Sequence, residues 1–353
     1  MVAGAGALGS WLGGALCLGG ADVTLVARST HRAVTAEHGL TVITADNRRS
    51  THPRVVGTVD EAFADGANYD LGLITVKSYD APGVAREIVA ALSRYPSARC
   101  AALATFQNGV GSEALVAATT AGVIEGPVVA GTLTTAVGLR EPGIVAGGAK
   151  GGVGIAARPA EAANMLADAL AAGGLQVTRH EDAAAMKWSK LLLNMIGSAT
   201  SAIVALPPAQ LFRNRDVFDL EVAAWNEALA VMKGAGLRPT ALPGYPVPTY
   251  AFALRWLPAP LRFPLLSARL AGSRGDRLPG VAADLVAGRA RSEINALHGA
   301  VADTGEALGI PVALNRALHD LVIDLATGGQ AREPFEGRPD ALLKALAPLR
   351  SIR

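Results

Sequence analysis

The first residues of the chain carry a glycine pattern that few folds accommodate. Gly4 to Gly9 reads G-x-G-x-x-G, and helical periodicity follows over about Ala7 to Leu18. Between a strand and a helix, the first glycine permits a tight turn and the second lets backbone approach a pyrophosphate. The third lets the helix pack closely on the strand. Amides at the start of a helix also attract phosphate. The pattern predicts a dinucleotide site formed by Gly4, Gly6, Ala7, Leu8 and Gly9.

A short glycine motif is weak evidence in a chain with 40 glycines, and the alternative is a small-residue helix packed on a sheet. The context favours the site, because an apolar run from Asp22 ends at Arg28. A carboxylate near this place would repel a ribose 2′-phosphate, whereas a guanidinium attracts it. We therefore expect NADPH as the cofactor. Only Met1, Val2 and Ala3 precede the motif, so either the first strand is unusually short or the natural start lies upstream.

Composition excludes several classes of protein. A chain of 353 residues, half of them hydrophobic and 18% charged, predicts two folded domains. The 32 basic and 30 acidic residues form no long runs, so neither a nucleic acid nor an anionic membrane is an expected partner. The uncharged stretch 1–21 lacks a basic start and is broken by glycines, unlike a signal peptide or membrane span. Cys17 and Cys100 lack metal-like spacing, so we expect buried thiols, no metal and a cytoplasmic protein.

Residues 1–180 alternate short apolar runs with Ala-rich helical stretches, which predicts an α/β domain with a doubly wound parallel sheet. The glycine-rich stretch 142–157 predicts antiparallel strands at one edge of that sheet, a helix follows, and Leu175–His180 closes the sheet. The other expected strands are Val23–Ala27, Leu71–Val76, Ala101–Thr105 and Val128–Thr132, and the helices are Glu61–Ala67, Ala81–Tyr95, Gly111–Ala121 and Glu161–Gly173.

From residue 181 to 353 the periodicity is helical, which predicts an all-α second domain. One segment differs, because residues 239–279 contain eight prolines with aromatic residues between them. Prolines at this density disfavour long regular helices. We interpret the segment as an insertion packed on the helical domain, and the alternative is a lid or a dimer contact.

Within the second domain, a run starting at Met186 carries a narrow polar stripe. On one continuous helix, its polar side chains fall within an arc of about 80°. Such a stripe is costly to bury without a ligand or partner, although a polar edge facing water is the more common arrangement. The residues of the stripe are Lys187, Lys190, Asn194, Ser198 and Ser201.

Three further residues stand at places where ligands bind. Glu293 lies beside apolar Ile294, and a solvated helix carboxylate is its alternative interpretation. Lys77 and Asn108 each follow an expected strand, and the carboxyl ends of parallel strands are where ligands bind. Either residue could equally be a cap or turn residue.

These pieces, in this order, resemble the ketopantoate reductase family. The resemblance covers Val2 to about Ala157, then Glu181–Ile203 and Ala287–Leu314. The matching pieces are Gly4–Gly9, Thr75–Tyr79, Gln107–Gly111, Trp188–Asn194 and Arg291–Ile294. The resemblance implies a Rossmann domain, a helical domain, a cleft between them, NADPH as hydride donor and a branched 2-oxo acid as acceptor. It also implies a homodimer, which the proline-rich segment could create or block.

The resemblance also implies residue roles. Lys190 would be the catalytic lysine, whose ammonium stabilises charge on the ketone oxygen and donates a proton. Glu293 would hold that lysine and orient substrate. The remaining roles are substrate binding by Asn194, positions beside the nicotinamide ribose and reacting centre for Asn108 and Lys77, and a 2′-phosphate contact for Arg28.

Some family positions are altered. A second family asparagine is Ser198 here, a serine before the glutamate-bearing helix is Gly280, and an Asn-Gly pair reads His298-Gly299. We expect reduction of 2-dehydropantoate for pantothenate and coenzyme A synthesis. The alternatives are a related reductase of another bulky 2-oxo acid and an NADP-binding sensor without turnover.

Overall fold

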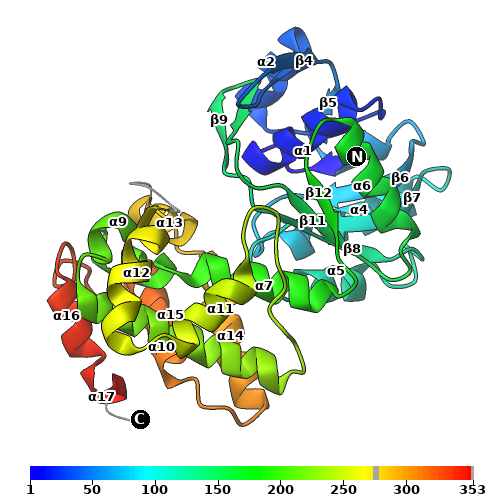
Figure 1. The fold of residues 1–353 in the computed structure, drawn as a ribbon. Coiled ribbons are helices and arrows are strands. Elements are labelled where there is room, and N and C mark those ends of the chain that lie inside the picture. The colour runs from blue at the N-terminus through cyan, green and yellow to red at the C-terminus, as the bar shows by residue number, and fades with distance from the viewer. Residues whose placement is uncertain (273–277, 351–353) are drawn as a thin grey trace. The chain divides into compact units, whose positions relative to one another are not determined.

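The structure is a computed structural model that describes residues 1–272 and 278–350 (Figure 1). The chain forms two compact units. The first contains Met1–Gln107, Gly111–Lys187 and Ala241–Tyr245, and the second contains Asn108–Val110, Trp188–Thr240 and the chain from Pro246. The polypeptide therefore passes between the units several times, whereas the sequence predicted a single boundary near residue 180.

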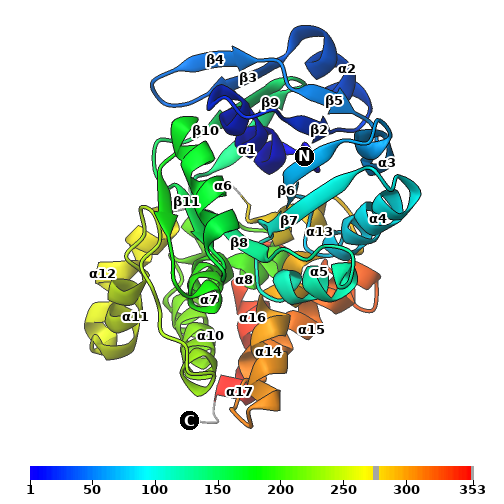
Figure 2. The same cartoon turned by 90° about the vertical axis from the view of Figure 1, so that its right-hand side faces the viewer.

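The first unit is built on a sheet of eight strands within the described chain (Figure 2). Six of them run parallel in the order β8-β7-β6-β1-β2-β5, with β5 at one edge of the sheet. Beyond β8, strands β11 and β12 extend the sheet in the opposite direction. In sheet order the strands are β12 Val177–Arg179, β11 Val153–Ala156, β8 Val128–Leu133, β7 Arg99–Thr105, β6 Asn68–Ile74, β1 Val2–Ala3, β2 Thr24–Val26 and β5 Arg54–Val56.

This strand order is that of a Rossmann fold, because the six parallel strands follow one another along the chain as 6-5-4-1-2-3 across the sheet. The order reverses between β1 and β6, and ligands of such sheets bind at that reversal. Strand β1 contains two residues in the described chain.

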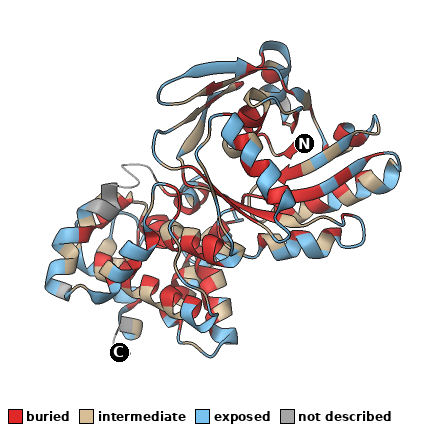
Figure 3. Ribbon diagram, turned by 45° about the vertical axis from the view of Figure 1, so that its right-hand side comes forward, coloured by how far each residue is buried: buried red, intermediate tan, exposed pale blue. Residues whose placement is uncertain are grey.

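Helices cover both faces of this sheet, and alternation along the strands divides the core into two halves. Val2 packs into one apolar cluster with α1 and α6, whereas Ala3 packs into the other with α3, α4 and α5. Figure 3 shows the strands of this sheet largely buried. The predicted helices are present, and α2 is an additional one. Their bounds are α1 Ala7–Leu18, α2 Ser29–His38, α3 Val59–Phe63, α4 Ala81–Arg94, α5 Ser112–Thr120 and α6 Glu161–Ala172.

A smaller sheet of four described strands corrects one expectation. The stretch 142–157 does form antiparallel pairs, but not at a single sheet edge. Its first strand pairs with a hairpin that the periodicity of the sequence did not indicate, and only β11 joins the main sheet. Alternating glycine and β-branched residues signal strands but do not specify their partners. The second sheet has the order β4 Arg48–Thr51, β3 Leu40–Ile43, β10 Ile144–Gly147 and β9 Val137–Glu141.

The second unit is helical throughout its described residues, as predicted. Its longest helix, α10, buries Phe218 and Trp225 and packs against several neighbours, including α14 and α15. No described helix is long and apolar enough to cross a membrane. The elements are α7 Ala183–Met195, which begins in the first unit, then α8 Ser198–Val204, α9 Pro208–Leu211, α10 Arg215–Gly234, α11 Val247–Trp256, α12 Ala259–Gly272, α13 Gly280–Val286, the 3-10 helix η1 Glu293–Ala296, α14 His298–Ala307, α15 Ala313–Thr327, α16 Pro339–Ala345 and α17 Ala347–Arg350.

The proline-rich segment is more helical than its composition suggests. Pro248 lies in the first turn of α11, where a missing N–H costs nothing, and Pro264 is tolerated inside α12. Val247 and Leu254 are buried, so α11 is a packed part of the unit. Residues 273–277 of the segment lie outside the described residues.

Cys17 and Cys100 are free thiols, as expected, and Cys100 is buried while Cys17 is half-buried.

Candidate functional site

The three glycines of the first turn have three different structural environments. Gly4 has a φ of +110°, and a Cβ there would lie 2.6 Å from Cγ1 of Val76. A Cβ on Gly9 would overlap the carbonyl oxygen of Gly4 and lie 2.6 Å from Oγ1 of Thr75. A Cβ on Gly6, in contrast, would meet nothing within 4 Å. Gly4 and Gly9 are therefore required by the fold, whereas at Gly6 the fold leaves open space.

That open space lies at the start of α1. Gly6 is the exposed N-cap residue of this helix, and no side chain caps it. Ala7 and Leu8 form its first turn, so their amides belong to the helix end that carries partial positive charge. Gly6 has no side chain, and no other protein atoms fill the space beside it. The turn therefore has room for a pyrophosphate close to its backbone.

The adjacent strand end holds this turn in place. Thr75, just after β6, donates its hydroxyl hydrogen toward the carbonyls of Ala3 and Gly4, at 3.1 and 2.9 Å. Lys77 follows two residues later and is half-buried. The predicted cofactor residues of β1 and β6 thus lie at neighbouring strand ends.

Arg28 is placed as the sequence predicts for a phosphate ligand. It follows β2, is the N-cap residue of α2, and has an exposed side chain. Among residues 1–272 and 278–350, no carboxylate pairs with its guanidinium. The structure thus places an exposed cation shortly after the end of the second strand.

In the second unit, the turn Asn108–Val110 joins two elements that are distant in sequence. The side-chain amide of Asn194, on α7, donates to Oδ1 of Asn108 at 2.9 Å. The amide of Val110 donates to the carbonyl of Ala296, the last residue of η1, at 3.1 Å. Gly109 has a φ of +81°, and a Cβ there would overlap Ala296. The turn therefore fits only with glycine at 109.

The elements that this turn joins carry the predicted catalytic residues. Lys190 lies one helical turn before Asn194 on α7, hence on the same side of the helix, and is half-buried. Glu293 is the first residue of η1 and is 5% exposed. The solvated alternative for Glu293 is therefore wrong. The second unit brings the elements of Asn108, Asn194 and Glu293 together.

The single polar helix expected over 186–203 is not present. Helix α7 ends at Met195, Gly197 adopts a φ of +69°, and α8 starts at Ser198. The break interrupts the expected stripe between Asn194 and Ser198, and both Ser198 and Ser201 are buried. A left-handed glycine commonly ends a helix, and the periodicity argument overlooked that signal.

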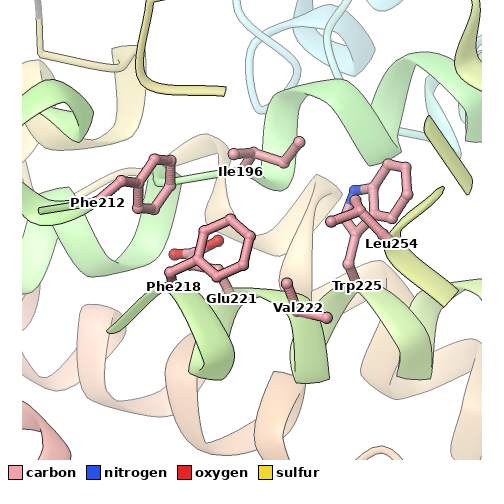
Figure 4. A pocket seen from close by; sticks show the side chains of 7 residues that line it. All are labelled: Ile196, Phe212, Phe218, Glu221, Val222, Trp225 and Leu254. Atoms are coloured by element: carbon pink, nitrogen blue, oxygen red, sulfur yellow. The ribbon is translucent and has the colours of Figure 1, made fainter. Parts of the chain in front are cut away.

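A buried carboxylate fixes the break between α7 and α8. Glu221 on α10 accepts hydrogen bonds from the amide of Gly197 at 3.0 Å and the hydroxyl of Thr200 at 2.6 Å. It stands at a small, otherwise apolar pocket in which no predicted site residue takes part (Figure 4). The pocket is lined by Ile196, Phe212, Phe218, Glu221, Val222, Trp225 and Leu254. This arrangement belongs to the packing that shapes the end of α7.

A buried histidine lies directly after η1. His298 bonds through Nδ1 to Oδ1 of Asn315 at 2.9 Å, and Asn315 in turn donates to Glu227. Complete burial lowers the pKa of His298 from 6.5 to about 4. Burial also raises the pKa of Glu227 above its ordinary value. His298 is therefore neutral at physiological pH, and it supports the fold behind η1.

Lys187, the first residue of the expected stripe, has a role that the periodicity did not predict. Its ammonium pairs with Glu113 inside the first unit instead of facing a ligand. The sequence around a lysine does not show which buried oxygen atoms will accept hydrogen bonds from its ammonium, because those atoms come from distant strands and loops.

A dinucleotide turn at the reversal of a Rossmann sheet, with a lysine and a buried carboxylate on a helical unit, defines a nicotinamide-dependent oxidoreductase. The profile of the family described as "Ketopantoate reductase PanE/ApbA" matches residues 1–159, and that of its C-terminal domain matches residues 182–326. The chain belongs to this ketopantoate reductase family.

Individual relatives agree with this membership. A 2-dehydropantoate 2-reductase of Halobacterium salinarum is 32% identical over 91% of this chain and 97% of the relative. A crystal structure of a family member from Ralstonia eutropha, 29% identical, has a TM-score of 0.75 and is matched over 94% of this chain and 99% of its own. The fold is also shared with a D-mandelate dehydrogenase solved with NADH and anilino(oxo)acetate, at 19% identity, a TM-score of 0.70, and coverage of 93% and 98%.

Proposed function

We propose that this protein reduces 2-dehydropantoate to pantoate with NADPH as hydride donor. The observation that carries the proposal is the turn Asn108–Val110, which joins the helix of Lys190 and Asn194 to the 3-10 helix of Glu293. The names of the curated relatives support the substrate.

The residues of the first unit suit the cofactor. We assign the pyrophosphate to the turn of Gly4, Gly6 and Gly9 with the amides of Ala7 and Leu8, because Gly6 leaves backbone exposed there. Arg28, exposed and without an ionic partner in the described chain, would take the 2′-phosphate that distinguishes NADPH from NADH. Lys77 and Asn108 would contact the nicotinamide end.

When bound, the nicotinamide supplies the hydride, and the protein must manage the charge and the proton at the ketone oxygen. Negative charge grows on that oxygen as the carbon is reduced. The ammonium of Lys190 would stabilise this charge and donate the proton that completes the hydroxyl group. Glu293, the buried first residue of η1, would hold this lysine in position and help to orient the substrate.

The remaining polar residues would hold the substrate. Asn194 and Asn108 already bond to each other, so their amides are oriented before any ligand enters. Ser198 is the first residue of α8, four residues after Asn194, and is 2% exposed. We assign it a substrate contact at the family position of a second asparagine, where its side chain reaches less far than an asparagine would.

A kinetic comparison of 2-oxo acids tests the proposal. The fall in NADPH absorbance is followed with 2-dehydropantoate and with other branched and aromatic 2-oxo acids. We expect the highest kcat/KM with 2-dehydropantoate. A higher kcat/KM with a different bulky 2-oxo acid would assign the protein to the related reductases. NADPH binding without turnover of any acid would identify a sensor.

A further inference from the structure

We propose that Lys187 is a positioning residue for this reaction, which fixes the main chain immediately before Asn108. The inference rests on the proposed function for its kinetic test, although its geometry is independent of the substrate. Lys187 and Lys190 are three residues apart on α7 and therefore face the same side. Gln107 is the residue directly before Asn108.

The ammonium of Lys187 is fully engaged inside the first unit. It donates to the carbonyl of Gln107 at 2.6 Å and to that of Gly131 at 3.5 Å, and it pairs with Oε1 of Glu113 at 2.9 Å. The Lys187 side chain is 4% exposed. An ammonium has three donors, and three acceptors surround this one. The shortest contact is the one to Gln107.

Gln107 extends this contact to the neighbouring strand. Its Nε2 donates to the carbonyls of Ile74 and Val76 at 2.8 and 3.1 Å, whereas its buried Oε1 has no hydrogen-bond partner among the residues that the structure describes. The orientation of the Gln107 side chain therefore satisfies its amide NH2 group, which donates both hydrogen bonds, and not its carbonyl oxygen. Through Gln107, Lys187 holds the end of β6, which leads to Lys77, against the end of β7, which leads to Asn108.

Stability alone is a weak reason for this arrangement. Removing an ammonium and a carboxylate from water offsets most of their attraction, and apolar groups of similar size often serve as well. The bond between Lys187 and Gln107 does something that apolar packing would not, because it sets the direction of a carbonyl one residue from Asn108. A displacement of about 1 Å at a reacting group can lower a rate about a hundredfold.

The test compares Lys187→Met with the double variant Lys187→Met/Glu113→Gln. For the single variant we expect kcat/KM with 2-dehydropantoate to fall by about tenfold or more, while the Kd of NADPH stays within about twofold. The double variant leaves no unpaired buried charge, so its Tm should return to the wild-type value while kcat/KM stays low. Lys150→Met, which removes an exposed lysine that stacks on Tyr245, is the matched control and should behave as wild type.

Two results would overturn the proposal. One is a wild-type kcat/KM in the single variant. The other is a double variant that recovers kcat/KM together with Tm, since the ion pair would then serve the fold only. If the single variant does not fold, the double variant decides alone.

A separate measurement distinguishes a wrong substrate assignment from a wrong role for Lys187. If the wild-type protein does not turn over 2-dehydropantoate, the proposed function is wrong, and amide hydrogen exchange of Asn108–Val110 decides on Lys187. Faster exchange of this turn in the double variant than in Lys150→Met supports a positioning role. Unchanged exchange excludes it.

Discussion

The glycine turn offers a substitution that separates cofactor binding from folding. Gly6 has φ and ψ of −77° and −162°, which alanine adopts without strain, and its Cβ would meet no atom within 4 Å. Gly6→Ala should therefore leave the fold intact, and the smaller entropy of the unfolded chain can add about 0.4–1 kcal/mol of stability. The added methyl group would nevertheless occupy the space that we assign to the pyrophosphate.

Gly9→Ala is the matched contrast. Its Cβ would overlap the carbonyl of Gly4 and crowd Thr75, so the helix and strand must move apart. Overpacking of this kind costs about 1–3 kcal/mol. For a unit of this size, each kcal/mol lowers Tm by about 2–4 °C.

Two assays on both variants test whether the glycine turn binds the pyrophosphate. In fluorescence titration, we expect Gly6→Ala to raise the Kd of NADPH at least about tenfold, which corresponds to about 1.4 kcal/mol of lost binding energy. In thermal unfolding without cofactor, Gly6→Ala should match the wild type and Gly9→Ala should melt several degrees lower. A Gly6→Ala variant that binds NADPH like the wild type would refute the assignment of the turn to the pyrophosphate.

Three further predictions concern single side chains. Arg28→Asp should weaken NADPH far more than NADH, because it replaces an attraction for the 2′-phosphate with a repulsion, and an unchanged preference in titrations with both would show that the ribose pocket is elsewhere. Lys190→Ala should lower kcat by about two orders of magnitude or more with little effect on Tm, and near-normal turnover would exclude its role as acid. Burial lowers the pKa of His298 to about 4, so as the pH falls from 6.5 the unfolded chain takes up this proton first, and the free energy of unfolding should drop by about 3 kcal/mol by pH 4. In denaturant titrations His298→Asn should remove that part of the pH dependence, and an identical slope in the variant would contradict it.

Several features of the fold followed from local patterns. The period of 3.6 residues located α1 at Ala7–Leu18, where the structure has it, and the change to helical periodicity after residue 180 predicted the helical second unit. Strand partners did not follow. The pairing of β3 with β10 joins residues about 100 positions apart, and a β pattern gives direction and face but no partner.

The sequence by itself determined which groups the protein presents and where its glycines stand, because steric demands on a turn and the period of a helix are local. The spacing of Gly4, Gly6 and Gly9 alone predicts a distinct purpose for each glycine. Gly4 and Gly9 have the crowded environments that their purposes require, and Gly6 has open space beside it. Only the tertiary structure decided which side chains meet. It placed Asn108 against Asn194 and paired Lys187 with Glu113. Those contacts depend on burial and on partners far along the chain, and no local pattern contains them.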